Sequence, residues 1–136
     1  MPKISIIIPT YDESQHLPLL LSDLSIFNDG IEVIIVDCNS NDKTRDIAKI
    51  YKASTHKSPQ KNRGLQLNIG AKKAKGEWFI FLHADSRLSQ DWLKKVKSVI
   101  RDRKNFIYFF KFKINNEKII YRFLELFVNL RSFIFK

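Results

Sequence analysis

A chain of 136 residues is long enough to bury the core of one domain and too short for several. Its hydrophobic content of 44%, with only four glycines and four prolines, excludes a disordered or collagen-like chain. The single cysteine, Cys38, excludes a disulfide framework and indicates a reducing compartment, where we expect this thiol to be inert. Because the amino terminus shows no basic-then-apolar leader and no window resembles a spanning helix, the sequence predicts a cytoplasmic protein.

The net charge of +10 is unevenly distributed along the chain. Residues 1–86 hold 11 Lys and Arg against 10 Asp and Glu, whereas residues 87–136 hold 13 against 4. Eight of the eleven phenylalanines also lie between Phe106 and Phe135. A basic and aromatic segment of this kind is typical of chains that bind nucleic acid, an anionic membrane surface or an acidic substrate.

The first part of the chain predicts alternating strands and helices. A β-branched run at 4–8 predicts a buried strand. The helix expected after it has four leucines on one face, namely Leu17, Leu20, Leu21 and Leu24. A second apolar run at 31–36 predicts another strand, with a polar loop at 37–42 behind it. A helix at about 43–51 and a short extended piece at 53–56 follow.

The alternation continues after a loop at 58–64. A helix through Leu67 and Ala71 is expected to end at Gly76. The short aromatic run at 78–83 predicts a buried strand that stops at a polar tip containing Asp85. An amphipathic helix at 90–103, a strand at 106–114 and a helix at 117–135 complete the chain. The pattern therefore predicts an α/β fold with a parallel-containing sheet and right-handed crossovers.

Three of the predicted strands are followed by acidic residues, with Asp12 and Glu13 after the first, Asp37 after the second and Asp85 after the fourth. Ligands of open α/β sheets bind outside the carboxyl ends of the strands, so these side chains are expected at a nucleotide and metal site. The sequence contains neither a dinucleotide-binding glycine motif nor a P-loop. Neutralisation of a diphosphate would then fall to a metal at Asp85, or to Lys61 and Arg63.

Four segments, in this order, resemble glycosyltransferase family 2. They are Ile-Ile-Ile-Pro-Thr-Tyr-Asp-Glu at 6–13, Val-Asp-Cys-Asn-Ser-Asn-Asp-Lys-Thr at 36–44, Arg-Gly-Leu-Gln-Leu-Asn-Ile-Gly at 63–70 and Phe-Leu-His-Ala-Asp-Ser at 81–86. The third and fourth segments resemble, more narrowly, a bacterial subgroup of that family. The resemblance implies the GT-A fold, a Rossmann-like mixed sheet flanked by helices, and transfer of a sugar from a nucleotide-sugar donor, most plausibly UDP-linked.

The resemblance also implies roles for individual residues. Those that match the family's nucleotide-binding positions are Pro9, Thr10, Tyr11, Glu13, Asp37, Arg63, Asn68 and Ala84. Among them, Asp37 matches the acid that hydrogen-bonds the base. Asp85 matches the last acid of the family's Asp-x-Asp, which holds Mn²⁺ or Mg²⁺ against the diphosphate. His83 stands where the first acid usually stands, and imidazole favours softer metals, so His83 is either a metal ligand or a packed strand-end residue.

A second departure from the family pattern concerns the catalytic base. Inverting members use a carboxylate beyond the metal motif, and none of the later acids lies in such a motif: Asp91, Asp102, Glu117 and Glu125. We therefore expect a single domain at 1–136 that is incomplete at its carboxyl end. It would hold a nucleotide-binding half at 1–87 and only the start of an acceptor half at 88–136. The acceptor, whether a glycan, a lipid or a small molecule, stays unidentified.

Plainer interpretations compete with these assignments. Asp42 and Asp37 are both of a type favoured in turns and at helix starts, and we favour that role for Asp42. The last predicted helix has an apolar face formed by Ile120, Phe123, Phe127, Leu130 and Ile134. Such a face predicts either a catalytically incomplete module that binds a partner or the inner face of a membrane without turnover, or a homodimer formed through apolar surface that a missing carboxyl-terminal half would cover. Binding of nucleic acid is not expected, because the aromatic residues fall at core spacing and no known motif occurs.

Overall fold

The computed structural model describes residues 3–25, 30–102, 108, 110, 113 and 118–134. The chain divides into two compact units, Met1–Lys97 and Ser98–Lys136, which are described separately below. The expected division into a nucleotide-binding half and the start of an acceptor half at residues 87 and 88 stays a prediction.

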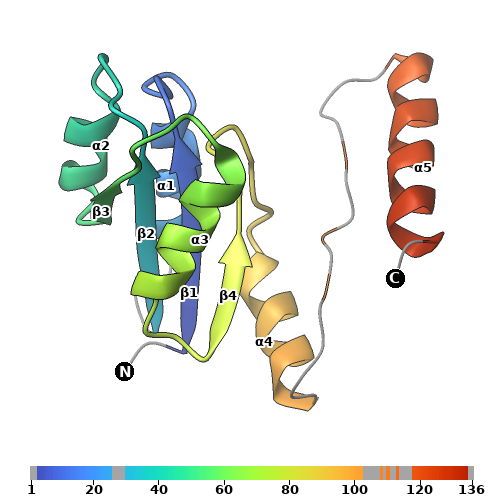
Figure 1. Cartoon of the computed structure of the whole chain (residues 1–136). Helices are drawn as coiled ribbons and strands as arrows, with labels where there is room; N and C mark the ends of the chain where they lie inside the picture. Colours follow the sequence, from blue (N-terminus) through green and yellow to red (C-terminus); the bar gives the residue numbers. More distant parts are fainter. Residues whose placement is uncertain are drawn as a thin grey trace. The chain divides into compact units, whose positions relative to one another are not determined.

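The first unit is built around a parallel sheet (Figure 1). Its strands in the described residues are β1 (Ile4–Thr10), β2 (Ile31–Asp37), β3 (Ser54–Lys57) and β4 (Trp78–Phe81), in the order β3-β2-β1-β4. All three strand pairs are parallel. The chain builds outward from β1 to β3 and then returns to place β4 on the other side of β1. Ligand sites of open sheets lie at the carboxyl ends of the strands where the order reverses, which here is between β1 and β4.

Helices connect the strands as the sequence predicts. They are α1 (Leu17–Ser25), α2 (Thr44–Ile50), α3 (Arg63–Lys73) and α4 (Trp92–Asp102), the last of which begins in the first unit. The predicted leucine face of α1 is confirmed, since all four leucines are buried. Every residue of β1 is buried, as expected for a central parallel strand covered on both faces. The α/β alternation read from the sequence is therefore confirmed.

Helix α3 covers one face of β1 and β2 (Figure 1). Beneath it lies a cluster of fully buried side chains, Ile7, Ile34 and Val36. Gly70 permits this contact, because a Cβ atom there would lie 2.4 Å from Cγ2 of Ile7 and 3.2 Å from Cγ2 of Val36. The contact at Gly70 therefore fixes how closely the middle of α3 approaches the sheet.

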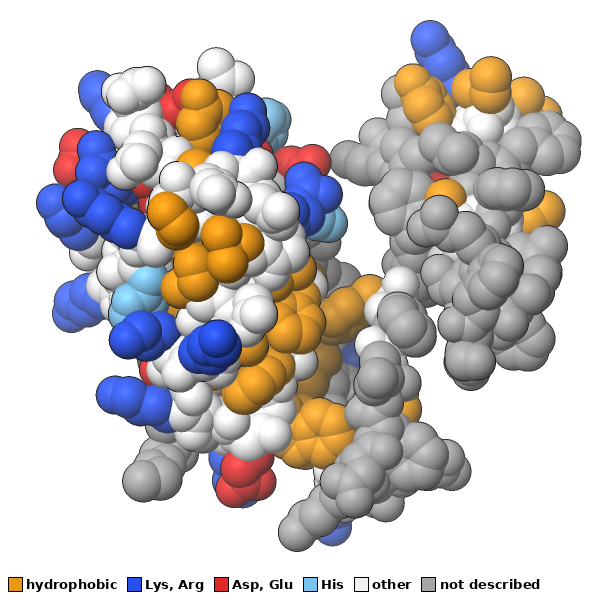
Figure 2. Space-filling view, in the orientation of Figure 1, with side chains coloured by type: hydrophobic (Ala, Val, Ile, Leu, Met, Phe, Trp, Pro, Cys, Tyr) orange, Lys and Arg blue, Asp and Glu red, His pale blue; other side chains and the backbone are white. Residues whose placement is uncertain are grey.

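The strand β4 is covered less completely. Ile80 is buried, whereas Phe79 and Phe81 are 44% and 49% exposed. In the register with β1, Phe79 lies opposite Ser5 and Phe81 opposite Ile7. Both phenylalanines therefore face the side of the sheet on which α3 packs, beyond the part that α3 covers. Figure 2 shows hydrophobic side chains along this flank of the first unit.

The second unit contains α5 (Ile119–Ile134), which confirms the last predicted helix. Of the apolar face predicted for it, only the Ile120 side chain belongs to the described part, and it is exposed. The strand predicted at 106–114 lies outside the described residues except for 108, 110 and 113, and it stays a prediction. Within the described residues, no helix is long and apolar enough to cross a membrane.

Candidate functional site

The candidate site lies at the carboxyl edge of the sheet, where the loops after the four strands emerge (Figure 1). The loop after β1 carries Asp12 and Glu13, the end of β2 carries Asp37, and the loop after β4 carries His83 and Asp85. The first turn of α3 starts at the same edge, because the loop after β3 leads directly into it. The structure therefore brings the predicted acidic loops to one edge of the sheet.

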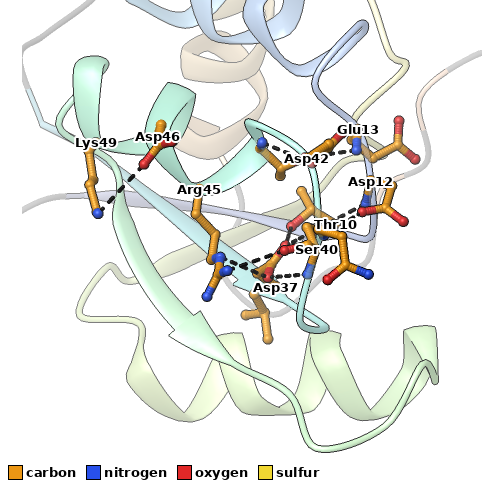
Figure 3. Close-up of polar contacts among 12 residues, drawn as sticks. Thr10, Asp12, Glu13, Asp37, Ser40, Asp42, Arg45, Asp46 and Lys49 are labelled. Atoms are coloured by element: carbon orange, nitrogen blue, oxygen red, sulfur yellow. Dashed lines mark hydrogen bonds and ion pairs between the residues drawn. The ribbon is translucent and has the colours of Figure 1, made fainter.

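The loops after β1 and β2 are joined by two hydrogen-bonded relays of the same design (Figure 3). In the first, the backbone N–H of Asp12 donates to Oγ of Ser40 over 2.9 Å, and that hydroxyl donates to Asp37. In the second, the N–H of Glu13 donates to Oγ1 of Thr44 over 2.8 Å, and that hydroxyl donates to Asp42 over 2.5 Å. Each hydroxyl thus accepts from one loop and donates to a carboxylate of the other.

Two further bonds close this arrangement. The N–H of Ser14 donates to Oδ2 of Asp42 over 2.9 Å, and the N–H of Asn41 donates to Oδ1 of Asp12 over 2.8 Å. Asp12 and Asn39 adopt positive φ values of 53° and 51°, which residues of their types tolerate best after glycine. We call the set Asp12, Asp37, Ser40, Asp42 and Thr44 the loop clasp. It fixes the backbone of the loop that carries Tyr11 and Glu13.

The carboxylate of Asp42 is held ionised by this environment. Desolvation alone would raise its pKa, but hydrogen bonds from Thr44 and Ser14 outweigh it and hold the pKa well below the usual range for Asp. Because Asp42 also accepts from the N–H of Thr44, two residues on, the turn interpretation that we favoured is confirmed, whereas the N-cap of α2 is Lys43 and has no side-chain cap bond. The bond of Asp42 to Ser14 in the other loop was not anticipated.

Asp37 lies inside the protein rather than on the surface of the site. Its side chain is fully buried, and Oδ1 accepts hydrogen bonds from the hydroxyls of Thr10 and Ser40. Oδ2 accepts from the N–H of Ser40 over 3.0 Å and lies 4.0 Å from Nε of Arg45. These partners all belong to the protein itself, whereas the resemblance implies a hydrogen bond to the base.

The other predicted residues of the first loop differ in their exposure. Pro9 and Thr10 are buried at the end of β1. Tyr11 is 37% exposed, and Nζ of Lys61 lies 3.7 Å from the centroid of its ring in a cation–π contact. Glu13 is half-buried, and its carboxylate lies 3.3 Å from Nδ1 of His16. Tyr11 and Lys61 therefore bring two loops together at the edge of the sheet.

Helix α3 presents its first turn at this edge. Asn62 is its N-cap, and the Asn62 side chain accepts from the N–H of Leu65 over 3.0 Å. Arg63, the first helical residue, is exposed. Asn68 is exposed as well, but five residues along a helix rotate it about 140° away from Arg63, at about 100° per residue. Arg63 and Asn68 therefore do not share one face of α3.

The loop after β4 carries the predicted metal residues. His83 and Asp85 are exposed, and Ala84 between them is buried. The N–H of Ser86 donates to the carbonyl of His83, which makes the segment a turn. Two residues after Asp85, the Arg87 side chain donates two hydrogen bonds, of 2.7 and 2.9 Å, to the carboxylate of Asp23 in α1. These bonds lower the pKa of Asp23, and they tie the Asp85 loop back to α1.

Comparison with known proteins identifies the family. The sequence model described as Glycosyl transferase family 2 matches residues 5–136. The chain belongs to glycosyl transferase family 2. The structure agrees with this assignment, since it superposes on residues 1–349 of Staphylococcus aureus TarS with a TM-score of 0.69, at 28% identity, over 74% of this chain and 32% of that one. The α/β fold is thus of the GT-A type, as the resemblance implied.

Family 2 proteins that are similar in sequence come from several bacteria. The poly(ribitol-phosphate) beta-N-acetylglucosaminyltransferase TarS of S. aureus is 28% identical in an alignment of 122 residues that covers 83% of this chain and 21% of TarS. A PGL/p-HBAD biosynthesis glycosyltransferase of Mycobacterium bovis is 34% identical in an alignment of 107 residues that covers 73% of this chain and 42% of the relative. An uncharacterized glycosyltransferase of Haemophilus influenzae is also 34% identical, over 70% of this chain and 41% of the relative. The chain thus spans about a fifth to two fifths of these relatives.

A divalent metal, which the family implies, is compatible with the residues present. Within the described ranges, no group of three or more His, Cys, Asp or Glu side chains is placed to hold a metal ion. A Mg²⁺ or Mn²⁺ ion that also binds a diphosphate needs only one or two carboxylates from the protein. Asp85, exposed at the carboxyl end of β4, fits that requirement, with His83 two residues before it.

Several residues of the site were missed by the sequence analysis. Ser40 and Thr44 lie in a recognised motif but were not singled out, since a hydroxyl in a polar loop has no distinctive pattern. Gln66 was missed too, although it is 4% exposed and makes two hydrogen bonds to strand ends. A buried polar residue within a helix is the signal that could have found it, because such a side chain needs partners.

Proposed function

We propose that this chain binds a nucleotide-sugar donor, UDP-linked, and belongs to a glycosyltransferase that transfers the sugar to an acceptor with inversion. The observation that carries the proposal is the loop clasp, which fixes the Tyr11 and Glu13 loop at the carboxyl edge beside the first turn of α3. Rigid loops at that edge of a parallel sheet are the usual form of a nucleotide site. The solved structure of TarS with UDP, 28% identical over 74% of this chain, supports UDP as the nucleotide.

In this proposal, exposed residues contact the donor and buried ones position them. Tyr11 offers a ring face to the base, a face that Lys61 covers in the free protein. Arg63 and Lys61 contribute positive charge near the diphosphate. Asp37 acts through Ser40 on the backbone of Asp12, because its carboxylate is fully buried and already has partners. Pro9 and Thr10 shape the end of β1, while Glu13, Asn68 and Ala84 stay predicted neighbours of the nucleotide.

Asp85 would hold Mn²⁺ or Mg²⁺ against the diphosphate, with His83 as a second ligand. The ion, when bound, neutralises the charge that develops on the leaving nucleoside diphosphate. The chain's own contribution is the position of the carboxylate, since the Arg87 and Asp23 bonds anchor the loop that carries it. Titration of UDP in the presence of each ion distinguishes Mn²⁺ from Mg²⁺.

The acceptor and the base of the inverting step are not assigned to residues. Asp91 pairs with Lys95 over 2.8 Å, and Glu125 pairs with Arg122 over 3.2 Å. The Asp91 pair is exposed and ordinary for the surface of a helix, whereas the Glu125 side chain is only 12% exposed, and neither acid lies in the sequence motif that the family uses for its base. The name of TarS describes a phosphate-containing polymer as its acceptor, and for the present chain we propose to test glycans, lipids and small molecules as acceptors.

The decisive experiment is a calorimetric titration of UDP, and in parallel GDP, with and without Mn²⁺ or Mg²⁺. We expect metal-dependent binding of UDP by the wild-type chain and loss of the metal dependence in Asp85→Ala. An Asp91→Ala variant is the matched control, because it removes an exposed carboxylate in an ion pair outside the proposed site. Absence of binding by the wild-type chain under every condition would overturn the proposal. Binding that is equal in Asp85→Ala and wild type would remove the metal role of Asp85.

A further inference from the structure

Among the described side chains of α3, only that of Gln66 forms hydrogen bonds to the backbone of the sheet. Its Nε2 donates to the carbonyl of Thr10 over 2.9 Å and to the carbonyl of Val36 over 2.7 Å. These carbonyls lie at the carboxyl ends of β1 and β2, on neighbouring central strands. The side chain is 4% exposed, so both bonds are shielded from water. A single amide group therefore joins α3 to the ends of two strands.

The chemistry of this position requires an amide. A Gln side chain offers two N–H donors on one nitrogen, which suits two carbonyl acceptors that lie side by side. A carboxylate of the same shape would place an oxygen against both carbonyls, and an apolar side chain would leave buried acceptors without this donor. The Thr10 carbonyl also accepts from the N–H of Cys38 over 3.1 Å, so Gln66 and Cys38 hold the same strand end.

We call the two hydrogen bonds of Gln66 the Gln66 clamp, and helix geometry connects this clamp to the candidate site. Gly70, one turn after Gln66, rests on Ile7 in the middle of β1, and Gln66 rests on the strand ends. Arg63 precedes Gln66 by three residues and lies on the same side of the helix, about 4.5 Å further along the axis. Because Gln66 is level with the strand ends, Arg63 lies beyond them, over the edge where the donor is proposed to bind.

We propose that Gln66 is a positioning residue for the nucleotide: it sets α3 on the ends of β1 and β2, and so places Arg63 beside the Tyr11 loop. Gln66 itself does not touch the donor, because its side chain is buried and its donors point at the backbone. The inference rests on the proposed function, since it assigns to Gln66 the geometry of that same site.

The test compares variants of Gln66 with controls for charge and for stability. Gln66→Met removes both donors at similar volume, and Gln66→Glu replaces them with an acceptor. Gln90→Glu makes the same chemical change at an exposed position. Leu24→Ala removes buried packing from α1, far in sequence from the clamp, and provides a variant with reduced stability and an intact clamp. The stability of every variant is measured by denaturant unfolding, and its affinity for UDP with Mn²⁺ by calorimetry.

We expect Gln66→Met and Gln66→Glu to raise the Kd for UDP by about tenfold, because α3 would no longer be held on the strand ends and Arg63 would be displaced from the donor. Gln90→Glu should bind as the wild type does, and Leu24→Ala should lose stability with an unchanged Kd. If Gln66→Met does not fold, Gln66→Asn serves instead, because its shorter side chain cannot span both carbonyls.

A second readout is independent of UDP. Cys38, the only cysteine of the chain, is buried and adjoins the strand end that Gln66 holds. The rate at which Cys38 reacts with a thiol reagent under native conditions should rise several-fold in the Gln66 variants. It should rise less in Leu24→Ala than in a Gln66 variant that has a similar free energy of unfolding. A folded Gln66→Met with wild-type Kd and wild-type thiol reactivity would overturn the positioning role. Failure of the wild-type chain to bind UDP is seen before any variant is made, and it would overturn the proposed function and this inference together.

Discussion

At the scale of single residues, the site depends on hydroxyl groups that donate and accept at once. Ser40 and Thr44 each accept a hydrogen bond from a backbone N–H of the first loop and donate one to a carboxylate of the second. A hydroxyl does both through a single oxygen atom, which has one O–H donor and two acceptor lone pairs. Asp37 and Asp42, at the far ends of these relays, accept but do not donate while ionised. The direction of each hydrogen bond is therefore fixed, because the N–H and O–H groups donate and the carboxylates accept.

We expect Asp42→Asn to change the pH dependence of stability. The folded-state pKa of Asp42 is lowered, so its ionised form stabilises the fold at every pH above the unfolded pKa of about 4. That contribution is lost as the pH falls below about 4 towards the folded pKa, because the proton then binds and the hydrogen bonds from Thr44 and Ser14 weaken. The variant should be less stable than the wild type near neutral pH, and the difference should shrink between about pH 4 and pH 2.

The control for this measurement is Asp46→Asn, one turn further along the chain. Asp46 is exposed and its described partner is Lys49, at 3.8 Å on the surface of α2. Surface pairs of this kind contribute about 0–1 kcal/mol, so Asp46→Asn should follow the wild-type curve. Urea unfolding at several pH values measures both variants. A constant difference between Asp42→Asn and the wild type across the acid range would contradict the role given to the Asp42 charge.

At the scale of secondary-structure elements, α3 is the helix that places the site. Its middle is fixed by the close approach of Gly70 to Ile7, and its first part by the bonds of Gln66 to the strand ends. We expect Gly70→Ala to push α3 away from the sheet, because Ile7 is fully buried and its Cγ2 atom has little room to move. Overpacking of this kind costs about 1–3 kcal/mol of the free energy of unfolding, and it should also raise the Kd for UDP.

The matched control lies in the same helix. A Cβ atom at Gly64 would meet only the Asn62 side chain, at 3.4 Å, and the position is exposed. Since alanine favours a helix over glycine by up to about 1 kcal/mol, Gly64→Ala should leave the stability unchanged or increase it. Thermal unfolding of the two variants therefore gives shifts of different sign or size. Equal effects of the two substitutions would show that Gly70 is not the contact point of α3.

The elements that the sequence predicts well are those whose pattern is local. The leucine spacing predicted α1 and the β-branched run predicted β1, and the structure confirms both. Burial of one face of a helix, or of both faces of a strand, leaves a pattern of apolar residues in the sequence. Gly76 shows the limit of such patterns. It was expected to end α3, but the helix ends at Lys73, and Gly76 instead packs against β1, where a Cβ atom would lie 2.7 Å from the backbone nitrogen of Ser5.

The site was predicted less completely than the fold, because its geometry depends on contacts between distant residues. The sequence placed Asp37 at a strand end, but its burial follows from Thr10, 27 residues away, and from Ser40. Gln66 reaches Thr10 across 56 residues, and a helical pattern alone does not reveal that contact. Motif resemblance found the loops; the roles of individual side chains within them required the structure.

At the scale of the whole molecule, the distribution of charge distinguishes binding to an anionic surface from binding of a small ligand at the donor site. Residues 1–86, which hold the proposed donor site, are nearly balanced in charge, whereas residues 87–136 carry 13 basic against 4 acidic residues. The described basic side chains on α4 are exposed: Lys94, Lys95, Lys97 and Arg101. An anionic surface would therefore be attracted mainly by the second part of the chain, and a small ligand at the donor site much less by the net charge.

We expect the chain to bind vesicles that contain about 30% phosphatidylserine more tightly than neutral vesicles, because each Lys or Arg near an anionic surface contributes about 1 kcal/mol. Binding should fall steeply as NaCl rises from about 0.05 M to about 0.5 M, since screening shortens the reach of exposed charges. The triple variant Lys94→Gln, Lys97→Gln, Arg101→Gln should lose affinity for the vesicles in a flotation assay. Its affinity for UDP should be unchanged.

The control removes the same number of charges from the first part of the chain. Lys72, Lys73 and Lys75 are exposed at the end of α3 and just beyond it, so their replacement by Gln matches the change in net charge. If attraction depends on the local density of charge on residues 87–136, this second triple variant should retain most of the vesicle binding. Equal loss in the two variants would mean that only the total charge of +10 matters, and salt-independent binding would point instead to insertion of apolar side chains.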